Sequence, residues 1–220
     1  MISLIEVLYR DKQLIAVSKP AGLAVHRGWC NDDQTVHDIV RDKIIGMPIH
    51  ALHRLDRATS GVLLFALDPT TARAINEQLE KGLAEKRYLA LVRGPMKEHC
   101  LLDYAIPQTK DGPRVAAVTE FFPLVHRDRF TLVEARPKTG RLHQIRRHLK
   151  HLSHPIVGDV RYGRGDINRI FRDQYGWHRM ALHATEITIE HPQGEKLTIE
   201  APLPAEMLQF FERFGLPAWQ

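Results

Sequence analysis

The stretch that decides the fold reads His53-Arg54-Leu55-Asp56-Arg57-Ala58-Thr59-Ser60-Gly61 and continues into an apolar run at residues 62–67. The polar part places a carboxylate between two arginines in a turn. The apolar part is typical of a strand that is covered on both faces. We therefore expect Asp56 at the edge of a sheet, where a carboxylate needs a nearby cation to stay ionised. The alternative is a structural Asp that caps the turn at residues 58–60.

Further helices and strands are expected on both sides of this stretch. Apolar runs bounded by turn residues predict strands at residues 14–18, 87–92, 116–122, 130–135, 186–190 and 196–200. Capping and stop residues predict helices from Thr35 to about Ile45, from Asp68-Pro69 to near Gly82, and over residues 205–214. The last helix should bury Met207, Leu208, Phe211 and Phe214. Many strands with few helices predict an α+β fold around a largely antiparallel or mixed sheet.

Composition narrows the class of protein. The chain has 220 residues, enough for one large domain or two small lobes, and no run approaches the roughly 20 apolar residues that cross a bilayer. The first six residues lack the basic region of a signal peptide. Cys30 and Cys100 are too far apart in the sequence to predict a disulfide framework or a thiolate metal site. We expect a cytoplasmic protein with no membrane partner.

Positive charge is concentrated in the basic segment, residues 136–151. The formal net charge is +5, and this segment holds six Lys/Arg, three His and no acid. A second set of arginines, diluted by acids, comprises Arg161, Arg164, Arg169, Arg172 and Arg179. A solvated helix face is the ordinary explanation for such residues. A run of one sign favours a polyanion such as RNA instead.

The basic segment is expected to form a helix that starts at Thr139-Gly140, with Arg141 in its first turn. Its apolar stripe would be Leu142, Ile145, Leu149 and Leu152. The polar residues expected on the other faces, where they would expose donors, are Arg141, Gln144, Arg147 and His148. Arg141 is our candidate for the cation that keeps Asp56 ionised.

A third segment, Glu85-Lys86-Arg87-Tyr88, puts a tyrosine on a basic strand. Such a side chain can stack on a flipped base, although a half-buried strand Tyr is the ordinary alternative. No G-x-G-x-x-G or G-x-x-x-x-G-K-[ST] predicts a nucleotide cofactor. His148, His151 and His154 leave a histidine metal site as a weaker alternative, with no H-E-x-x-H beside them.

Taken together, these motifs resemble the RluA family of pseudouridine synthases. They are His53-Arg54-Leu55-Asp56-x-x-Thr59-Ser60-Gly61, Lys86-Arg87-Tyr88 and Thr139-Gly140-Arg141-x-His143-Gln144-Ile145-Arg146. The resemblance extends from Lys19-Pro20-x-Gly22 and Val25-His26-Arg27-x-Trp29 to Ala181-Leu182-His183-Ala184. It implies one catalytic domain over residues 1–220, without an S4-like extension. It also implies a central, mostly antiparallel sheet in two lobes flanked by helices, with an RNA cleft between the lobes.

The resemblance also implies roles for single residues. Asp56 would be the catalytic carboxylate, Arg54 the residue that enters the RNA helix when the base flips, and Tyr88 the active-site tyrosine. Arg141 would pair with the Asp, and we expect RNA contacts from its neighbours His143, Gln144 and Arg147. No metal, cofactor or obligate protein partner is implied.

The implied substrate is a uridine of structured RNA, most simply a T-stem uridine of tRNA (position 65). An rRNA target stays open, because residues 111–130 form a shorter segment than the family leads us to expect. Asp56 would act on C1′ of the ribose either as a nucleophile or by removing a ribose proton to give a glycal. An RNA-binding protein without catalysis and a nucleosidase that releases uracil are the rival functions.

Overall fold

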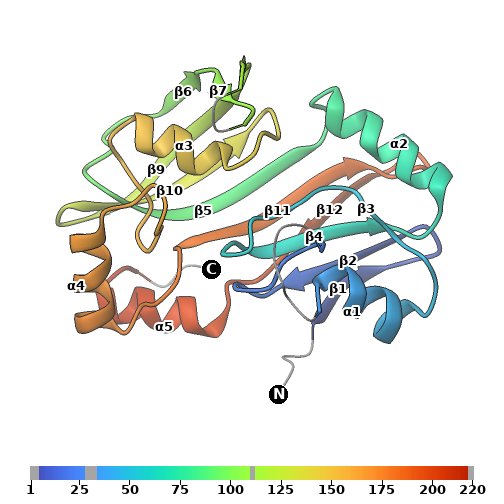
Figure 1. Ribbon diagram of the computed structural model, residues 1–220, viewed down its shortest axis with the longest axis horizontal. Helices are drawn as coiled ribbons and strands as arrows, with labels where there is room; N and C mark the ends of the chain where they lie inside the picture. The colour runs from blue at the N-terminus through green and yellow to red at the C-terminus, as the bar shows by residue number, and fades with distance from the viewer. Residues whose placement is uncertain (1–4, 28–33, 110–111, 218–220) are drawn as a thin grey trace. The chain divides into compact units, whose positions relative to one another are not determined.

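The computed structural model describes residues 5–27, 34–109 and 112–217 (Figure 1). Trp29, Cys30 and Asp111 lie outside the described residues. The chain forms two compact units, each built from separated parts of the sequence. Unit 1 comprises Met1–Lys86 and Ala184–Pro202, and unit 2 comprises Arg87–His183 and Leu203–Gln220. In the part of the chain that is described, no helix combines the length and apolar character needed to cross a membrane.

Unit 1 is organised by a sheet in the order β1-β2-β4-β11, with β12 beside β11 and β3 beside β4. The strands are β1 (Glu6–Arg10), β2 (Leu14–Lys19), β3 (His50–Ala51), β4 (Ser60–Ala66), β11 (Leu182–Glu190) and β12 (Lys196–Glu200). The pairs β1/β2, β2/β4, β3/β4 and β11/β12 are antiparallel. Every residue of β4 is buried, which confirms the strand expected after the polar turn.

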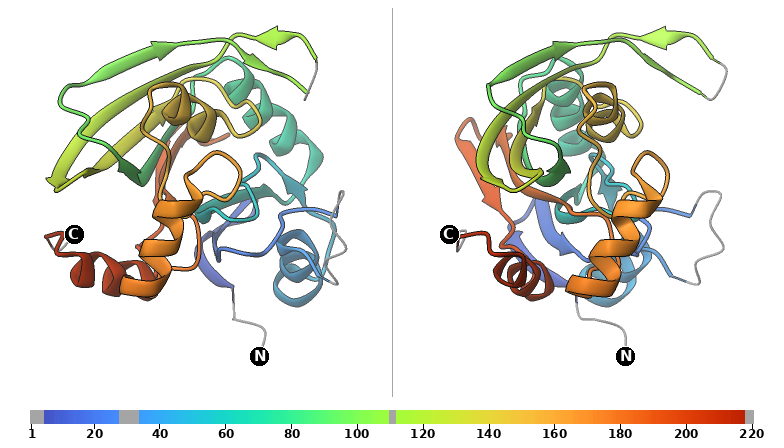
Figure 2. Two further views of the ribbon diagram at one scale, coloured as in Figure 1. Left: turned by 60° about the vertical axis from the view of Figure 1, so that its left-hand side comes forward. Right: turned by 90° about the vertical axis from the view of Figure 1, so that its left-hand side faces the viewer.

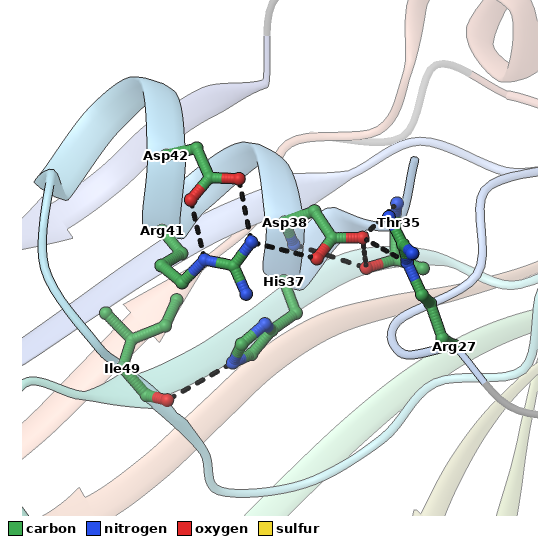
Figure 3. Close-up of polar contacts among 7 residues, drawn as sticks. All are labelled: Arg27, Thr35, His37, Asp38, Arg41, Asp42 and Ile49. Carbon is green, nitrogen blue, oxygen red and sulfur yellow. Dashed lines mark hydrogen bonds and ion pairs between the residues drawn. The ribbon is translucent and has the colours of Figure 1, made fainter. Parts of the chain in front are cut away.

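The helices of unit 1 begin at the expected capping residues. Thr35 and Asp38 form a capping box at the start of α1 (Val36–Ile39), which continues as a π-helical turn, η1 (Val40–Ile45). Arg41 lies between Asp38 and Asp42, and His37 bonds the Ile49 carbonyl (Figure 3). Asp68 caps α2 (Pro69–Glu80), with Pro at its first position.

Unit 2 is organised by an antiparallel sheet in the order β5-β10-β9-β6. Its strands are β5 (Glu85–Arg93), β6 (Cys100–Asp103), β9 (Val118–Arg127) and β10 (Phe130–Pro137). Two short strands, β7 (Ile106–Pro107) and β8 (Arg114–Val115), pair as a separate hairpin. In Figure 2 this hairpin, in green, extends the run of β6 and β9.

Three helices belong to unit 2: α3 (Gln144–His151), α4 (Gly165–Tyr175) and α5 (Ala205–Phe214). Figure 1 shows α3 over β9 and β10, and α4 beside α5. Phe171 of α4 lies 5.3 Å from Phe214 and 4.9 Å from Phe130, ring centre to ring centre. Leu208, expected in the core, is 42% exposed, and Phe210 is buried instead. The sequence did not predict α4.

Candidate active site

Asp56 lies in a loop of unit 1, the Asp56 loop (residues 53–59), directly before the buried strand β4. The N–H of Thr59 donates to the Asp56 carbonyl at 3.0 Å and closes the turn. Leu55 is buried, Asp56 is half-buried, and Arg54 and Arg57 are exposed. Asp56 is therefore a half-buried carboxylate that lies directly before a buried strand.

His53 ties the start of this loop to β4. Its Nε2 accepts a hydrogen bond from the Leu64 N–H at 3.2 Å, and the neighbouring Leu52 N–H donates to the Leu64 carbonyl at 3.1 Å. Burial, aided by the nearby charge of Lys86, lowers the pKa of His53 to about 3. The ring is therefore neutral at physiological pH, and since Nε2 is the acceptor, its proton is on Nδ1.

Lys19, at the end of β2, holds the other side of the loop. Its fully buried ammonium group donates to the carbonyls of Pro20 at 2.8 Å, Leu23 at 2.7 Å and Arg57 at 3.1 Å. Arg57 Nε donates to the Gly22 carbonyl at 2.8 Å, and the Gly22 N–H donates back to the Arg57 carbonyl at 2.7 Å. The Lys19-Pro20-x-Gly22 motif thus clamps residue 57 beside Asp56.

In the sequence, Lys19-Pro20-x-Gly22 marks one end of the family resemblance, and its positioning role was not predicted. The signal was present: a lysine that ends an otherwise apolar strand must bring its charge to internal acceptors. Gly61, another residue of the motif, is required on physical grounds. It has φ +121°, and a Cβ there would collide with the backbone of Ala184 in β11.

In unit 2, the helix of the basic segment begins later than expected. His143 has a left-handed backbone (φ 55°), so α3 starts at Gln144 and not at Thr139-Gly140. Gln144 Oε1 accepts from the Arg141 N–H at 3.0 Å and from the Thr139 hydroxyl at 2.7 Å. Arg141 therefore lies in the turn before the helix, and Leu142 is 39% exposed outside the apolar stripe.

Two residues expected to expose donors are buried instead. Gln144 uses its amide N–H groups on the Val118 carbonyl and the Thr119 hydroxyl, both at 2.9 Å. His148 bonds the same hydroxyl through Nδ1 and the Tyr104 carbonyl through Nε2, again at 2.9 Å. Burial lowers the pKa of His148. The prediction was wrong because both side chains face the sheet, where paired polar groups are tolerated.

The remaining predicted site residues of unit 2 keep more exposure. Arg141 is exposed, with Nε donating to the Ala116 carbonyl at 3.2 Å. Arg147 and His143 are half-buried and both bond the Tyr162 hydroxyl at 3.0 Å. Tyr88 is half-buried on β5, opposite Ala135 of β10. Asp56 and Arg54 thus belong to unit 1, and the other predicted site residues to unit 2.

A buried ion pair in unit 2 had no signal in the sequence. Arg146 donates from Nε and one terminal nitrogen to the two oxygens of Asp159, at 2.7 and 2.9 Å. The two side chains are only 9% and 1% exposed. Burial alone would raise the pKa of Asp159, but the hydrogen bonds and charge of Arg146 hold it below its usual value. From the sequence, Asp159 was interpreted only as one of the acids that dilute the second set of arginines.

The histidines proposed as an alternative metal site have separate partners. His148 bonds Thr119, His151 stacks on Tyr104 at 3.6 Å between ring centres, and His154 bonds the Arg93 carbonyl at 2.9 Å. Within residues 5–27, 34–109 and 112–217, no three His, Cys, Asp or Glu side chains converge as metal ligands would.

Comparisons with known proteins identify the family of the chain. Residues 13–151 match the family described as RNA pseudouridylate synthase. The tRNA pseudouridine synthase C of Vibrio parahaemolyticus is 39% identical, over 96% of this chain and 95% of its own. The protein of that name from Haemophilus ducreyi is 41% identical, over 96% of each chain.

Solved structures show the same fold. Human RNA pseudouridylate synthase domain containing 4 has a TM-score of 0.78 and 28% identity, over 95% of this chain and 92% of its own. Human RNA pseudouridylate synthase domain containing 1 also has a TM-score of 0.78, with 26% identity over 93% and 85%. The α+β architecture is thus that of the pseudouridine synthases. The chain belongs to the RNA pseudouridylate synthase family and is a pseudouridine synthase.

Proposed function

We propose that this enzyme isomerises one uridine of tRNA to pseudouridine, with Asp56 as the catalytic carboxylate. The observation that carries the assignment is the Asp56 loop, in which Lys19, His53 and a closed turn hold a half-buried carboxylate in place. Relatives named tRNA pseudouridine synthase C, similar over nearly their whole length, support tRNA as the substrate. An enzyme of tRNA works where tRNA is, so we place it in the cytoplasm.

The reaction rearranges bonds within one nucleotide. The bond between N1 of uracil and C1′ breaks, the base turns, and C5 bonds C1′. C5 loses its proton and N1 gains one, so no oxidant, reductant or group donor is consumed. Positive charge that develops at C1′ is stabilised by a carboxylate, as in glycosidases. In this enzyme Asp56 is the proposed carboxylate, and it acts either by attacking C1′ or by removing a ribose proton to give a glycal.

The other predicted residues take supporting roles in this proposal. Arg54 is exposed beside Asp56 and enters the space that the flipped base leaves. Tyr88 stacks on the base, and Arg141, His143 and Arg147 meet the RNA. Gln144, buried under Arg141, acts by holding the main chain of that arginine. That Arg141 is the cation for Asp56 stays a prediction.

The test uses a tRNA transcript labelled with tritium at C5 of uridine, because isomerisation releases that tritium. Asp56→Asn should lose tritium release while binding the transcript with a nearly unchanged Kd. Asp42→Asn, an exposed carboxylate of unit 1, is the matched control and should keep full activity. Substantial turnover by Asp56→Asn would refute the role of Asp56. Release of free uracil by the wild type would indicate a nucleosidase instead.

The target position is tested separately. Carbodiimide mapping of tRNA and rRNA from cells with and without the gene should show one lost pseudouridine, at the T-stem uridine (position 65) of tRNA. Loss of a pseudouridine in rRNA would show that the substrate is rRNA and not tRNA. It would also suggest that the short segment at residues 111–130 alters the specificity.

A further inference from the structure

The ring of Tyr162, in unit 2, is surrounded by cationic side chains. Measured to the ring centre, the charged groups lie at 5.0 Å for Arg146, 5.6 Å for Arg161, and 5.9 Å for both Arg147 and Lys150. Cations are attracted to the negative face of an aromatic ring, so Tyr162 partly offsets their mutual repulsion. Four positive groups lie around this ring, and in the described part of the chain Arg146 alone among them has an acidic partner, Asp159, so positive charge is in local excess.

Two of these four cations are already engaged within the unit. Arg146 is paired with Asp159, and Arg147 donates to the Tyr162 hydroxyl and to the Pro107 carbonyl. Lys150 and Arg161 are different, because both are exposed. Apart from the Tyr162 ring, neither has an ion-pair or side-chain hydrogen-bond partner in the described part of the chain.

Hydrogen bonds hold both the turn that carries Arg161 and the Tyr162 ring that Lys150 and Arg161 share. Asp159 Oδ1 accepts from the N–H groups of Arg161 at 2.9 Å and Tyr162 at 3.0 Å, which fixes the turn that carries them. The Tyr162 hydroxyl bonds Arg147 and His143, each at 3.0 Å, which ties the ring to the start of α3. The main chain of Arg161 and the ring are therefore held in place before a ligand binds, which leaves only the two cationic side chains to be ordered.

We propose that Lys150 and Arg161 form a phosphate-binding pair that holds the backbone of the RNA substrate, with Tyr162 as their shared support. The pair rests on the proposed function, in which the substrate is RNA. Its chemistry fits a phosphate because both groups are exposed donors of positive charge. Two other arginines of the second basic set do not qualify, because Arg164 pairs with Asp166 at 3.1 Å and Arg179 with Glu206 at 2.7 Å.

The test measures the Kd for a tRNA transcript as a function of salt. Lys150→Gln and Arg161→Gln should each reduce the log–log salt slope by about 0.7, which corresponds to about fivefold weaker binding at 0.1 M salt. The double variant should lose about 25-fold on the same basis. Arg164→Gln is the matched control: it removes another exposed arginine, three residues away, whose charge is already paired, so the salt slope should not change.

In the single variants kcat/KM for the transcript should fall by the same factor as the affinity, because the pair binds the RNA backbone. Phosphate-ethylation interference should show one or two phosphates that matter to the wild type and not to the double variant. A double variant that keeps the full wild-type slope and the same interference pattern would overturn the pair alone. A wild type that does not bind tRNA would overturn the proposed function and the pair with it.

Discussion

The two regions that carry the family motifs are held in place by buried cations of different kinds. In unit 1, Lys19 donates to three backbone carbonyls around the Asp56 loop. In unit 2, Arg146 makes a two-point ion pair with the carboxylate of Asp159. Both cations are buried, yet the first is held by main-chain dipoles and the second by an opposite charge.

The different partners of Lys19 and Arg146 show what each buried cation holds in place. Carbonyl acceptors fix the path of the main chain, so Lys19 holds residue 57 whatever side chains the loop carries, and the exposed Arg54 stays available at the surface. A carboxylate fixes another side chain, and Asp159 in turn orders the turn that carries Tyr162. The residues proposed to react thus lie on a clamped backbone, whereas the cations proposed to face RNA lie on a network of side chains.

The largest effect is expected from breaking the buried ion pair. Arg146→Met leaves Asp159 buried and charged, which costs about 3–5 kcal/mol of the free energy of unfolding. Urea titration should show this loss. Arg164→Met is the control, since it breaks an exposed pair with Asp166 and should cost less than about 1 kcal/mol. Equal losses in the two variants would show that burial does not distinguish these pairs.

Removing the lysine of unit 1 is expected to cost less. Lys19→Met fits the apolar end of β2 but removes one donor from each of three carbonyls, of which that of Arg57 keeps the Gly22 N–H. We expect a loss of about 2–3 kcal/mol. Turnover should fall as well, because the clamp beside Asp56 is released. The exposed Lys12→Met should change stability by less than about 0.5 kcal/mol. Unfolding by urea and tritium release measure the two effects; a Lys19 variant as stable as the wild type would contradict the clamp.

A smaller effect separates catalysis from binding in the basic segment. Arg141→Ala should lower kcat about tenfold, or about 1.4 kcal/mol, with a lesser change in the Kd for tRNA. Lys138→Ala, from the same segment but paired with Glu120 at 2.8 Å, should leave kcat unchanged. If binding by the Arg141 variant fell in parallel with turnover, Arg141 would be a phosphate contact and not the cation for Asp56.

The smallest effect concerns pH, and it too differs between the two regions. His53 has a folded pKa of about 3 against about 6.5 when unfolded, so the unfolded state binds more protons between these values. Stability should therefore fall as pH drops below about 6.5, by about 1 kcal/mol from pH 6 to pH 5 through this residue. His53→Gln should flatten that part of the curve in thermal unfolding measured against pH. An unchanged slope would mean that His53 is protonated in the folded enzyme.

Asp159 acts at lower pH. The folded pKa of Asp159 is below its ordinary value, so its contribution is present above that ordinary value and is lost as pH falls through the folded pKa. On acidification, the hydrogen bond between His53 and β4 in unit 1 should therefore weaken before the Arg146–Asp159 ion pair of unit 2.

Local structure followed well from the sequence. Thr35 and Asp68 cap the helices expected of them, and β4 lies where the apolar run predicts it. The short elements escaped prediction because they hold too few residues for a clear period. In α4, Ile167, Ile170 and Phe171 do recur at helical spacing, but the sequence there was interpreted only as a set of arginines diluted by acids. The prediction that Leu208 is buried was wrong because one turn of α5 offers two apolar side chains, Leu208 and Phe210. Packing against Phe171 and its neighbours selects Phe210 for the core.

The sequence by itself determined the family resemblance, the order of the motifs and the place of Asp56 before a buried strand, because each is written in consecutive residues. Tertiary structure decided which charged residues are buried, paired or exposed. Arg141 and Arg146 are five residues apart in one basic run, yet one is exposed and the other is held by Asp159. The reason is physical: the fate of a charge depends on the solvent and partners around it, and Asp159 reaches Arg146 from thirteen residues along the chain.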